Sequence, residues 1–230
     1  DDGILLGIEE VDNLIKPKAK KNVVVLMVGG LGTRLRPLTN DTPKPLLKVG
    51  NKPILETIIE SFSRYGFKDF ILSINYKSEM FENYFGDGST LGVNITYIHE
   101  RKRLGTAGAL SLMQGKLQED FFVMNGDLLT NINFDYIPYG VVDIADGVVK
   151  SIVEKPIHKF FVSAGVYMLS PSTLSNIPKD TFYDMPTLFE KLIKLEEKTV
   201  SFPLREYWLD IGRIEEYEKA NMEYDEVFHA

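Results

Sequence analysis

Short apolar runs rich in β-branched residues alternate along this chain with segments of helical periodicity. Strands are expected over residues 23–28, 70–74, 93–98 and 121–124. Helices are expected over residues 54–62, 77–84, 106–117, 184–195 and 214–224. Such alternation implies right-handed crossovers and helices on both faces of a sheet. The prediction is an α/β fold, with a Rossmann-like, mainly parallel (mixed) sheet sandwiched by helices and ligands bound beyond the carboxyl ends of the strands.

The composition of the chain excludes several classes of function. The 230 residues include no cysteine, which excludes disulfides, zinc-thiolate sites, iron–sulfur ligation and cysteine nucleophiles, and favours a reducing, cytoplasmic location. The net charge of -7 argues against a broad basic surface for nucleic acid. No apolar run approaches the roughly 20 residues that a membrane-spanning helix needs, so neither nucleic acid nor a membrane is an expected partner.

The first residues differ from the rest. Residues 1–22 pass from a short apolar and acidic stretch to a run of lysines and proline at 16–21, which is typical of a linker. We expect one domain over residues 23–230. Because the chain does not begin with Met, we also expect it to be a fragment of a longer protein.

A glycine-rich loop follows the first expected strand. Gly29, Gly30 and Gly32 let the backbone approach a ligand closely and point successive N–H groups at phosphate oxygens. Arg34 and Lys44 add positive charge. The spacing matches neither a Walker loop nor a dinucleotide fingerprint, which disfavours a nicotinamide dehydrogenase. Taken alone, these glycines are equally compatible with a surface turn flanked by solvated cations.

Two aspartates have surroundings unusual for a carboxylate. Asp127 follows the strand expected at 121–124, and Asp210 lies in an aromatic and apolar stretch. Magnesium typically binds one or two carboxylates together with substrate phosphates. From spacing alone, helix caps or turn residues are the favoured interpretation. A glycosidase carboxylate pair stays open, but it would leave the glycine-rich loop unexplained.

Residues 29–46 match the signature GGxGTRLxPLTxxxPKPL throughout. On this motif the chain resembles the sugar-1-phosphate nucleotidyltransferases, and the likeness extends from Asn22 to the C-terminus. The resemblance implies a single nucleotidyltransferase (GT-A-like) domain in which a sugar 1-phosphate attacks the α-phosphorus of a nucleoside triphosphate and pyrophosphate leaves. It also implies that Arg34 stabilises the transition state and the leaving pyrophosphate, that Lys44 contacts phosphate near the α position, and that Asp127 and Asp210 hold Mg²⁺.

The same resemblance assigns the remaining site residues. Those expected to bind the nucleotide are Met27, Gly29, Gly30, Gly32, Thr33, Glu100, Gly105 and Thr106. Those expected to bind the sugar are Gly140, Glu154, Lys155 and Ser163. Lys155 is also expected to contact the phosphate group of the sugar 1-phosphate. At Ser163 the chain departs from the family, which usually has Asn there. Without the resemblance, Glu154 and Lys155 are more typical of a solvated strand end.

Glu100 bears on the choice of base. It occupies the position at which pyrimidine-using relatives have a Gln that pairs with the base. An ionised carboxylate only accepts hydrogen bonds, so it complements the N1–H and 2-amino donors of guanine and opposes the O4 of uracil or thymine. The prediction is therefore GTP, the alternative being that Glu100 is simply a surface carboxylate at a strand end.

The sugar is assigned by resemblance alone. The loop at 100–110 and the segment at 202–221 are most similar to guanylyltransferases that make GDP-glucosamine, so glucosamine 1-phosphate is expected, with mannose 1-phosphate as the main alternative. In that group a pair of regulatory CBS modules precedes the catalytic domain, and residues 7–14 resemble the end of such a module. A homo-oligomer is compatible with the sequence.

Two further expectations concern a missing segment of the chain and the alternative to an enzyme. Asp127 and Glu154 lie closer together in the chain than is usual in the family, so we expect a segment to be missing from the sequence near 133–138 rather than deleted from the protein. A catalytically silent subunit that binds sugar nucleotide is the alternative to an enzyme. The retention of charged site residues argues against it: Arg34, Lys44, Asp127, Lys155 and Asp210.

Overall fold

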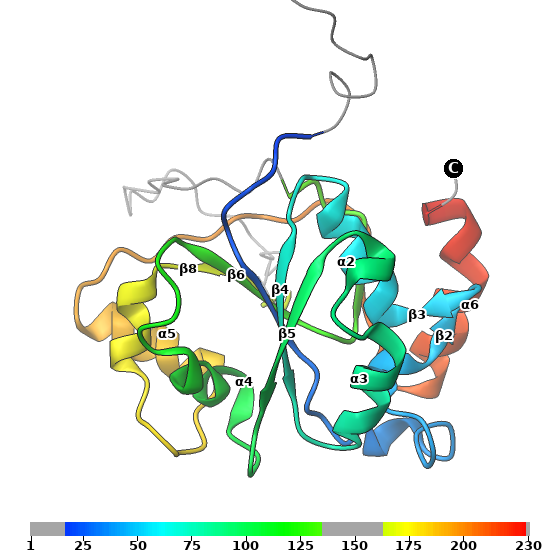
Figure 1. Ribbon diagram of the computed structural model, residues 1–230, viewed down its shortest axis with the longest axis horizontal. Coiled ribbons are helices and arrows are strands. Elements are labelled where there is room, and N and C mark those ends of the chain that lie inside the picture. Colours follow the sequence, from blue (N-terminus) through cyan, green and yellow to red (C-terminus); the bar gives the residue numbers. More distant parts are fainter. Residues whose placement is uncertain (1–16, 135–162, 229–230) are drawn as a thin grey trace, which may run out of the picture.

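The computed structural model describes residues 17–134 and 163–228, and the structural statements below concern these residues. Its centre is a five-stranded sheet in the order β5-β4-β1-β6-β8 (Figure 1). The strands are β1 (Val24–Met27), β4 (Asp69–Ile74), β5 (Asn94–His99), β6 (Phe121–Asn125) and β8 (Val166–Leu169). β1 pairs in parallel with β4 and β6, β5 is parallel to β4, and β8 runs antiparallel to β6. The predicted mainly parallel, mixed sheet is confirmed.

Helices cover both faces of the sheet. In Figure 1, α2 and α3 lie on one side and α4 and α5 on the other. The helices are α2 (Ile54–Ser63), α3 (Ser78–Phe85), α4 (Gly105–Gly108), α5 (Met185–Lys194) and α6 (Ile214–Phe228), with 3₁₀ turns η1 (Thr33–Leu35), η2 (Lys44–Leu46), η3 (Ser89–Leu91), η4 (Ala109–Met113) and η5 (Pro171–Asn176). No helix within the described ranges is long and apolar enough to cross a membrane.

Alternation along the central strands produces two apolar cores. Phe122 and Met124 pack in the core that contains α2, whereas Phe121 and Val123 pack in the core that contains α5. Successive side chains of a strand point to opposite faces. A strand that is apolar on both faces must therefore be covered twice, which is why a continuous apolar run correctly predicted the sandwich.

The helix expected over 106–117 is the main error of the sequence prediction. The structure instead has the short α4 followed by the 3₁₀ turn η4. The N–H groups of Ala107 and Gly108 both donate to the carbonyl of Tyr183, at 2.9 and 2.7 Å. Gly115 then adopts a φ of 75°, so the backbone leaves the helical conformation. Both N–H groups lie in the first turn of α4, where a helix offers no acceptor of its own, so the Tyr183 carbonyl caps this short helix, and the helical conformation is lost through η4 and at Gly115.

Two small antiparallel pairs, which the sequence prediction did not include, complete the fold. β2 (Lys48–Val49) pairs with β3 (Lys52–Pro53), and β7 (Leu128–Thr130) pairs with β9 (Trp208–Asp210). The C-terminal helix α6 packs on the first pair. The Tyr217 hydroxyl donates to the Lys48 carbonyl at 2.5 Å, and Asn221 Oδ1 accepts from the Gly50 N–H at 3.1 Å.

Gly50 provides a test of this packing. It has a φ of 64°, and a Cβ at this position would overlap the ring of Tyr224. Gly50→Ala should lower the free energy of unfolding by about 2–4 kcal/mol, because a left-handed alanine is strained and the ring must move. Urea denaturation measures the loss.

Gly92→Ala is the matched control. Gly92 has a similar φ of 67°, but nothing lies within 4 Å of its added Cβ. It should therefore show only the conformational cost, about 1 kcal/mol. Equal losses for the two variants would contradict the tight packing of α6 on this hairpin.

Candidate functional site

The glycine-rich loop leaves the sheet at the carboxyl end of β1. Gly32 has a φ of 61°, and its carbonyl accepts hydrogen bonds from the Thr39 hydroxyl at 2.8 Å and the Leu35 N–H at 3.0 Å. A Cβ at Gly32 would lie 3.0 Å from Thr39 Cγ2 and 3.2 Å from Lys44 Cβ. The loop therefore folds back on itself, and the absence of a side chain at Gly32 lets Lys44 pack against it.

Lys44 lies between the two predicted metal ligands. Its side chain is only 8% exposed, and its Nζ lies 2.6 Å from Asp127 Oδ2 and 3.8 Å from Asp210 Oδ1. The buried ammonium thus has its charge balanced by carboxylates that are 31% and 48% exposed. Residues separated widely in the chain converge on one position, which spacing alone did not favour.

Close packing and strand register bring the two aspartates together. Gly126 donates its N–H to the Met27 carbonyl at 3.0 Å, and a Cβ on Gly126 would overlap Val28. This contact holds the end of β6 against the end of β1. β7 begins two residues after Gly126, and its pairing with β9 sets Leu128 opposite Asp210. Asp127 and Asp210 are therefore both close to the Lys44 ammonium.

Asp210 is in a setting that disfavours its negative charge. Burial raises the pKa of Asp210, and the nearby charge of Asp127 raises this pKa further, while Lys44 and Arg34 act in the opposite direction. Added positive charge at this position would relieve the cost of the ionised form. Carboxylate oxygens are the hard ligands that Mg²⁺ prefers, so the two residues fit that ion.

The same two carboxylates do not make a complete metal cage. Within residues 17–134 and 163–228, no group of three or more His, Asp or Glu side chains is arranged to hold a metal ion. Magnesium commonly completes its coordination with water and substrate phosphates. The arrangement therefore suits an ion that arrives with a phosphorylated ligand.

A cavity of about 250 Å³ opens beside this cluster. It is lined by Met27, Val28, Gly30, Leu31, Gly32, Thr33, Arg34, Leu35, Lys44, Pro45, Arg103, Asp127 and Gly212. The structure thus brings together seven of the residues selected from the sequence, while Arg103 and Gly212 were not selected. Gly212 lies directly beside the Arg34 guanidinium: a Cβ at Gly212 would be in van der Waals contact with Arg34 Nη1, at 3.5 Å, and 3.1 Å from Glu216 Oε2.

Glu100 lies next to the loop rather than in the cavity wall. Its Oε1 accepts from the Ser73 hydroxyl at 2.9 Å, and its Oε2 accepts from the Leu104 N–H at 3.2 Å. A Cβ at Gly29 would lie 3.0 Å from Oε1. Burial raises the pKa of Glu100, although both hydrogen bonds and the charge of Arg103 oppose the shift.

Gly105 and Thr106 have structural contacts outside the cavity lining. Gly105 has a φ of 80°, and a Cβ there would lie 2.7 Å from Asp184 Oδ1. Asp184 Oδ1 accepts from the Thr106 N–H at 3.2 Å, while the Thr106 hydroxyl accepts from the Met185 N–H at 2.9 Å. These contacts join α4 to the beginning of α5, and the predicted nucleotide contact of both residues stays a prediction.

The predicted sugar-binding residues are mostly beyond the structural description. Gly140, Glu154 and Lys155 lie outside the described residues, as does most of the predicted junction at 133–138. Ser163 is exposed, with its hydroxyl 2.7 Å from that of Tyr167, and does not line the cavity.

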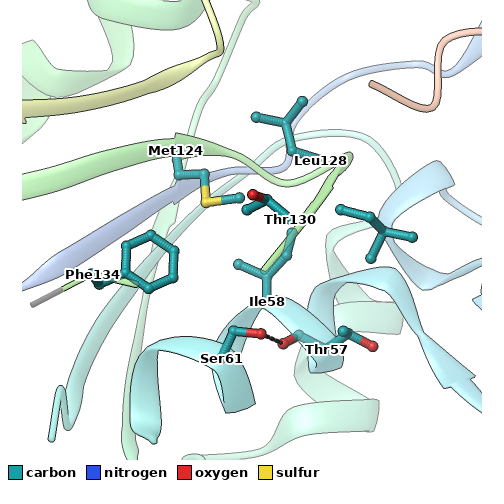
Figure 2. A pocket seen from close by; sticks show the side chains of 8 residues that line it. Thr57, Ile58, Ser61, Met124, Leu128, Thr130 and Phe134 are labelled. Carbon is teal, nitrogen blue, oxygen red and sulfur yellow. Dashed lines mark hydrogen bonds between the residues drawn. The ribbon is translucent and has the colours of Figure 1, made fainter. Parts of the chain in front are cut away.

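A second concave region lies in the apolar core between α2, β6 and β7. Figure 2 shows Met124, Leu128 and Phe134 around it, with the Ser61 hydroxyl donating to the Thr57 carbonyl at 2.8 Å. The side chains leave no volume for even a water molecule. This region is packed core and not a substrate site.

The sheet and the cavity define an α/β protein with a cavity, lined by two arginines and a lysine, at the carboxyl ends of its strands. The chain belongs to the Nucleotidyl transferase family, whose pattern matches residues 23–138 and 135–227. This match spans the described sheet, the glycine-rich loop and both aspartates.

Its relatives include guanylyltransferases. The chain is 36% identical over 230 residues to probable mannose-1-phosphate guanylyltransferase 3 of Oryza sativa subsp. japonica, covering 84% of this chain and 62% of that protein. It is 34% identical over 240 residues to mannose-1-phosphate guanyltransferase of Saccharomyces cerevisiae, covering 87% and 64%. The chain therefore spans less than two thirds of these curated relatives.

Solved structures share the fold. HddC from Yersinia pseudotuberculosis complexed with GMP-PN has a TM-score of 0.67 and 28% identity, covering 88% of this chain and 99% of that one. A putative glucose-1-phosphate thymidylyltransferase from Bacillus anthracis has a TM-score of 0.72 with 21% identity, covering 86% and 93%. The second likeness concerns the fold alone.

The hydrogen bond from the Met185 N–H to the Thr106 hydroxyl can be tested by substitution. Thr106→Val should lower the free energy of unfolding by about 1 kcal/mol, because the first N–H of α5 loses its hydroxyl acceptor. Thr106→Ser retains the hydroxyl and should stay near the wild type. Denaturation of both variants measures the effect, and a fully stable Thr106→Val would contradict the capping role.

Proposed function

We propose that this chain is a sugar-1-phosphate nucleotidyltransferase that joins GTP and a hexose 1-phosphate into a GDP-sugar and pyrophosphate. The observation that carries this proposal is the convergence of Lys44, Asp127 and Asp210 beside a glycine-rich, arginine-bearing loop. Membership of the Nucleotidyl transferase family supports the reaction class. Retention of both aspartates, Lys44 and Arg34 weighs against a silent binding subunit.

The chemistry is a displacement at phosphorus. A phosphate oxygen of the sugar 1-phosphate bonds to the α-phosphorus, and the bond from that phosphorus to the oxygen bridging to the β-phosphate breaks, so the electron pair leaves with pyrophosphate. The two substrates bring about six negative charges together. Lys44 holds the α-phosphate, while Arg34 and the N–H groups of residues 30–33 hold the departing phosphates. In-line positioning and electrostatic stabilisation then lower the barrier without a covalent enzyme intermediate.

Asp127 and Asp210 are the residues that would hold Mg²⁺ in this proposal. When bound, Mg²⁺ supplies charge neutralisation and a fixed orientation for the triphosphate. The neighbouring carboxylates and the raised pKa of Asp210, which burial causes first and Asp127 second, support their use as cation ligands.

Glu100 supports the choice of GTP. Its two oxygens retain acceptor capacity beyond the single hydrogen bond that each makes, since a carboxylate has about four lone-pair sites. The guanylyltransferase names of the relatives point the same way.

Two hexoses remain candidates. The sequence resemblance of the 100–110 and 202–221 segments favours glucosamine 1-phosphate. The relatives found are named for mannose 1-phosphate, which favours that substrate. Gly140, Glu154, Lys155 and Ser163 are the residues proposed to read the sugar.

The proposal is tested by pyrophosphate release across four nucleoside triphosphates and a set of sugar 1-phosphates, with Mg²⁺ or with EDTA. We expect release with GTP and either glucosamine or mannose 1-phosphate, and loss of release in EDTA.

Asp127→Asn and Asp210→Asn should each reduce turnover by at least about 10²-fold, because phosphate charge is no longer neutralised. Near wild-type turnover in both variants would contradict the metal assignment, and no release from any pair would contradict the enzyme.

Glu100→Gln tests base selection separately. We expect kcat/KM with GTP to fall about tenfold or more, because an amide cannot accept from both guanine donors, and use of UTP to rise.

The raised pKa of Glu100 predicts a pH dependence as well, because this carboxyl takes up its proton at higher pH than an ordinary Glu. GTP preference in the wild type should therefore decline as pH falls through that raised pKa, whereas Glu100→Gln should show no such decline.

Glu119→Gln is the control for this change of charge. Glu119 is exposed and precedes β6, so it lies at the amino end of the sheet, away from the site. Unchanged GTP preference in Glu100→Gln would contradict the base-reading role.

A further inference from the structure

Arg103 is a cation of the cavity that the site assignments above do not use. It belongs to the segment between β5 and α4, whereas Arg34 and Lys44 come from the loop after β1 and its continuation. All three line the same cavity. In the part of the chain that the structure describes, Arg103 forms no hydrogen bond and no ion pair within 4.0 Å. Its neighbour Lys102, in contrast, pairs with Asp180 at 3.0 Å.

The charges of the cavity wall favour a multiply charged anion. The lining residues include three cations and one carboxylate, Asp127, which is already paired with Lys44 at 2.6 Å. Arg34 and Arg103 therefore have no carboxylate partner among the residues that line the cavity. The chain as a whole has a net charge of -7, so the cavity wall is positive against an acidic background. A guanidinium offers a planar fork of donors that matches the oxygens of a phosphate.

The segment that carries Arg103 connects the base-reading side of the site to the phosphate side. Glu100, at its beginning, lies next to Gly29, and Arg103 interacts with the Glu100 carboxylate through charge. Among the described residues the Glu100 oxygens accept from Ser73 and Leu104, and no hydrogen bond joins them to Arg103. The Arg103 fork therefore stays available to a ligand that extends from the base side into the cavity.

We propose that Arg103 binds the triphosphate of the nucleotide. It acts as a second arginine on these phosphates, from the segment between β5 and α4, whereas Arg34 acts from the loop after β1. This inference rests on the proposed function, because it takes a nucleoside triphosphate as the ligand. It assigns Arg103 to the β- and γ-phosphates rather than to the base or the sugar phosphate. Affinity should then depend on Arg103 in proportion to the number of phosphates that the nucleotide carries.

The test compares GTP with GMP by isothermal titration calorimetry, with Mg²⁺ and without sugar phosphate. For Arg103→Gln we expect the Kd of GTP to rise about tenfold or more, as for the loss of a charge-assisted hydrogen bond. The Kd of GMP should stay within about twofold of the wild type. Thermal melts check folding, which should be preserved because Arg103 is exposed and makes no bond among the described residues.

Arg101→Gln is the matched control. Arg101 lies in the same run, is exposed and does not line the cavity, so the variant removes the same charge from the same segment. Both nucleotides should bind it as they bind the wild type. Arg103→Gln binding GTP as tightly as Arg101→Gln would overturn the inference, and so would equal losses for GTP and GMP, which would place Arg103 on the base or the α-phosphate.

Failure of the proposed function gives a different result. If the wild type binds GTP and releases pyrophosphate but Arg103→Gln is unaffected, only the role of Arg103 is overturned. If the wild type binds another triphosphate in place of GTP, the same comparison with that triphosphate and its monophosphate decides the role. If the wild type binds none of the four triphosphates, the proposed function and the inference are both overturned.

Discussion

The ion pair between Lys44 and Asp127 is the interaction on which the site depends. Burying an ammonium is costly unless a carboxylate compensates its charge, and here that requirement ties the chain after the glycine-rich loop to the end of β6 at 2.6 Å. Asp210 joins the same cluster at 3.8 Å because β9 pairs with β7. Three distant segments are thus held in one arrangement by charge as well as by apolar packing.

Local pattern predicted four of the five central strands, because short apolar runs rich in β-branched and aromatic residues are typical of strands that are covered on both faces; β8 (Val166–Leu169) was not among the expected strands. Local pattern failed for short or irregular elements. The expected helix over 106–117 is instead the short α4 followed by the 3₁₀ turn η4, and the backbone leaves the helical conformation at Gly115, whose φ is 75°. β7 and β9 are three-residue strands, too short for a detectable period. A run of charges such as 100–103 is typical of a solvated loop, and only the fold shows that Arg103 lines the cavity.

Glycines in the motifs have two separate causes, which the sequence cannot distinguish. Gly30 lines the cavity with open space where its Cβ would be, as expected of a residue over which a ligand passes. Gly105, by contrast, is required by its positive φ and its contact with Asp184. A glycine that the resemblance assigns to ligand binding can therefore have a sufficient reason in packing alone, and the structure separates the two cases residue by residue.

The contact between Gly126 and Val28 has a consequence for how this protein can diverge. A side chain at Gly126 would overlap Val28, and the preceding close packing fixes the entry to Asp127. Substitutions at the two positions are therefore coupled: a larger residue at 126 requires a smaller residue at 28 and must also fit 3.2 Å from the Met27 carbonyl oxygen. Such dependence of one substitution on another, or epistasis, restricts the order in which residues 28 and 126 can change.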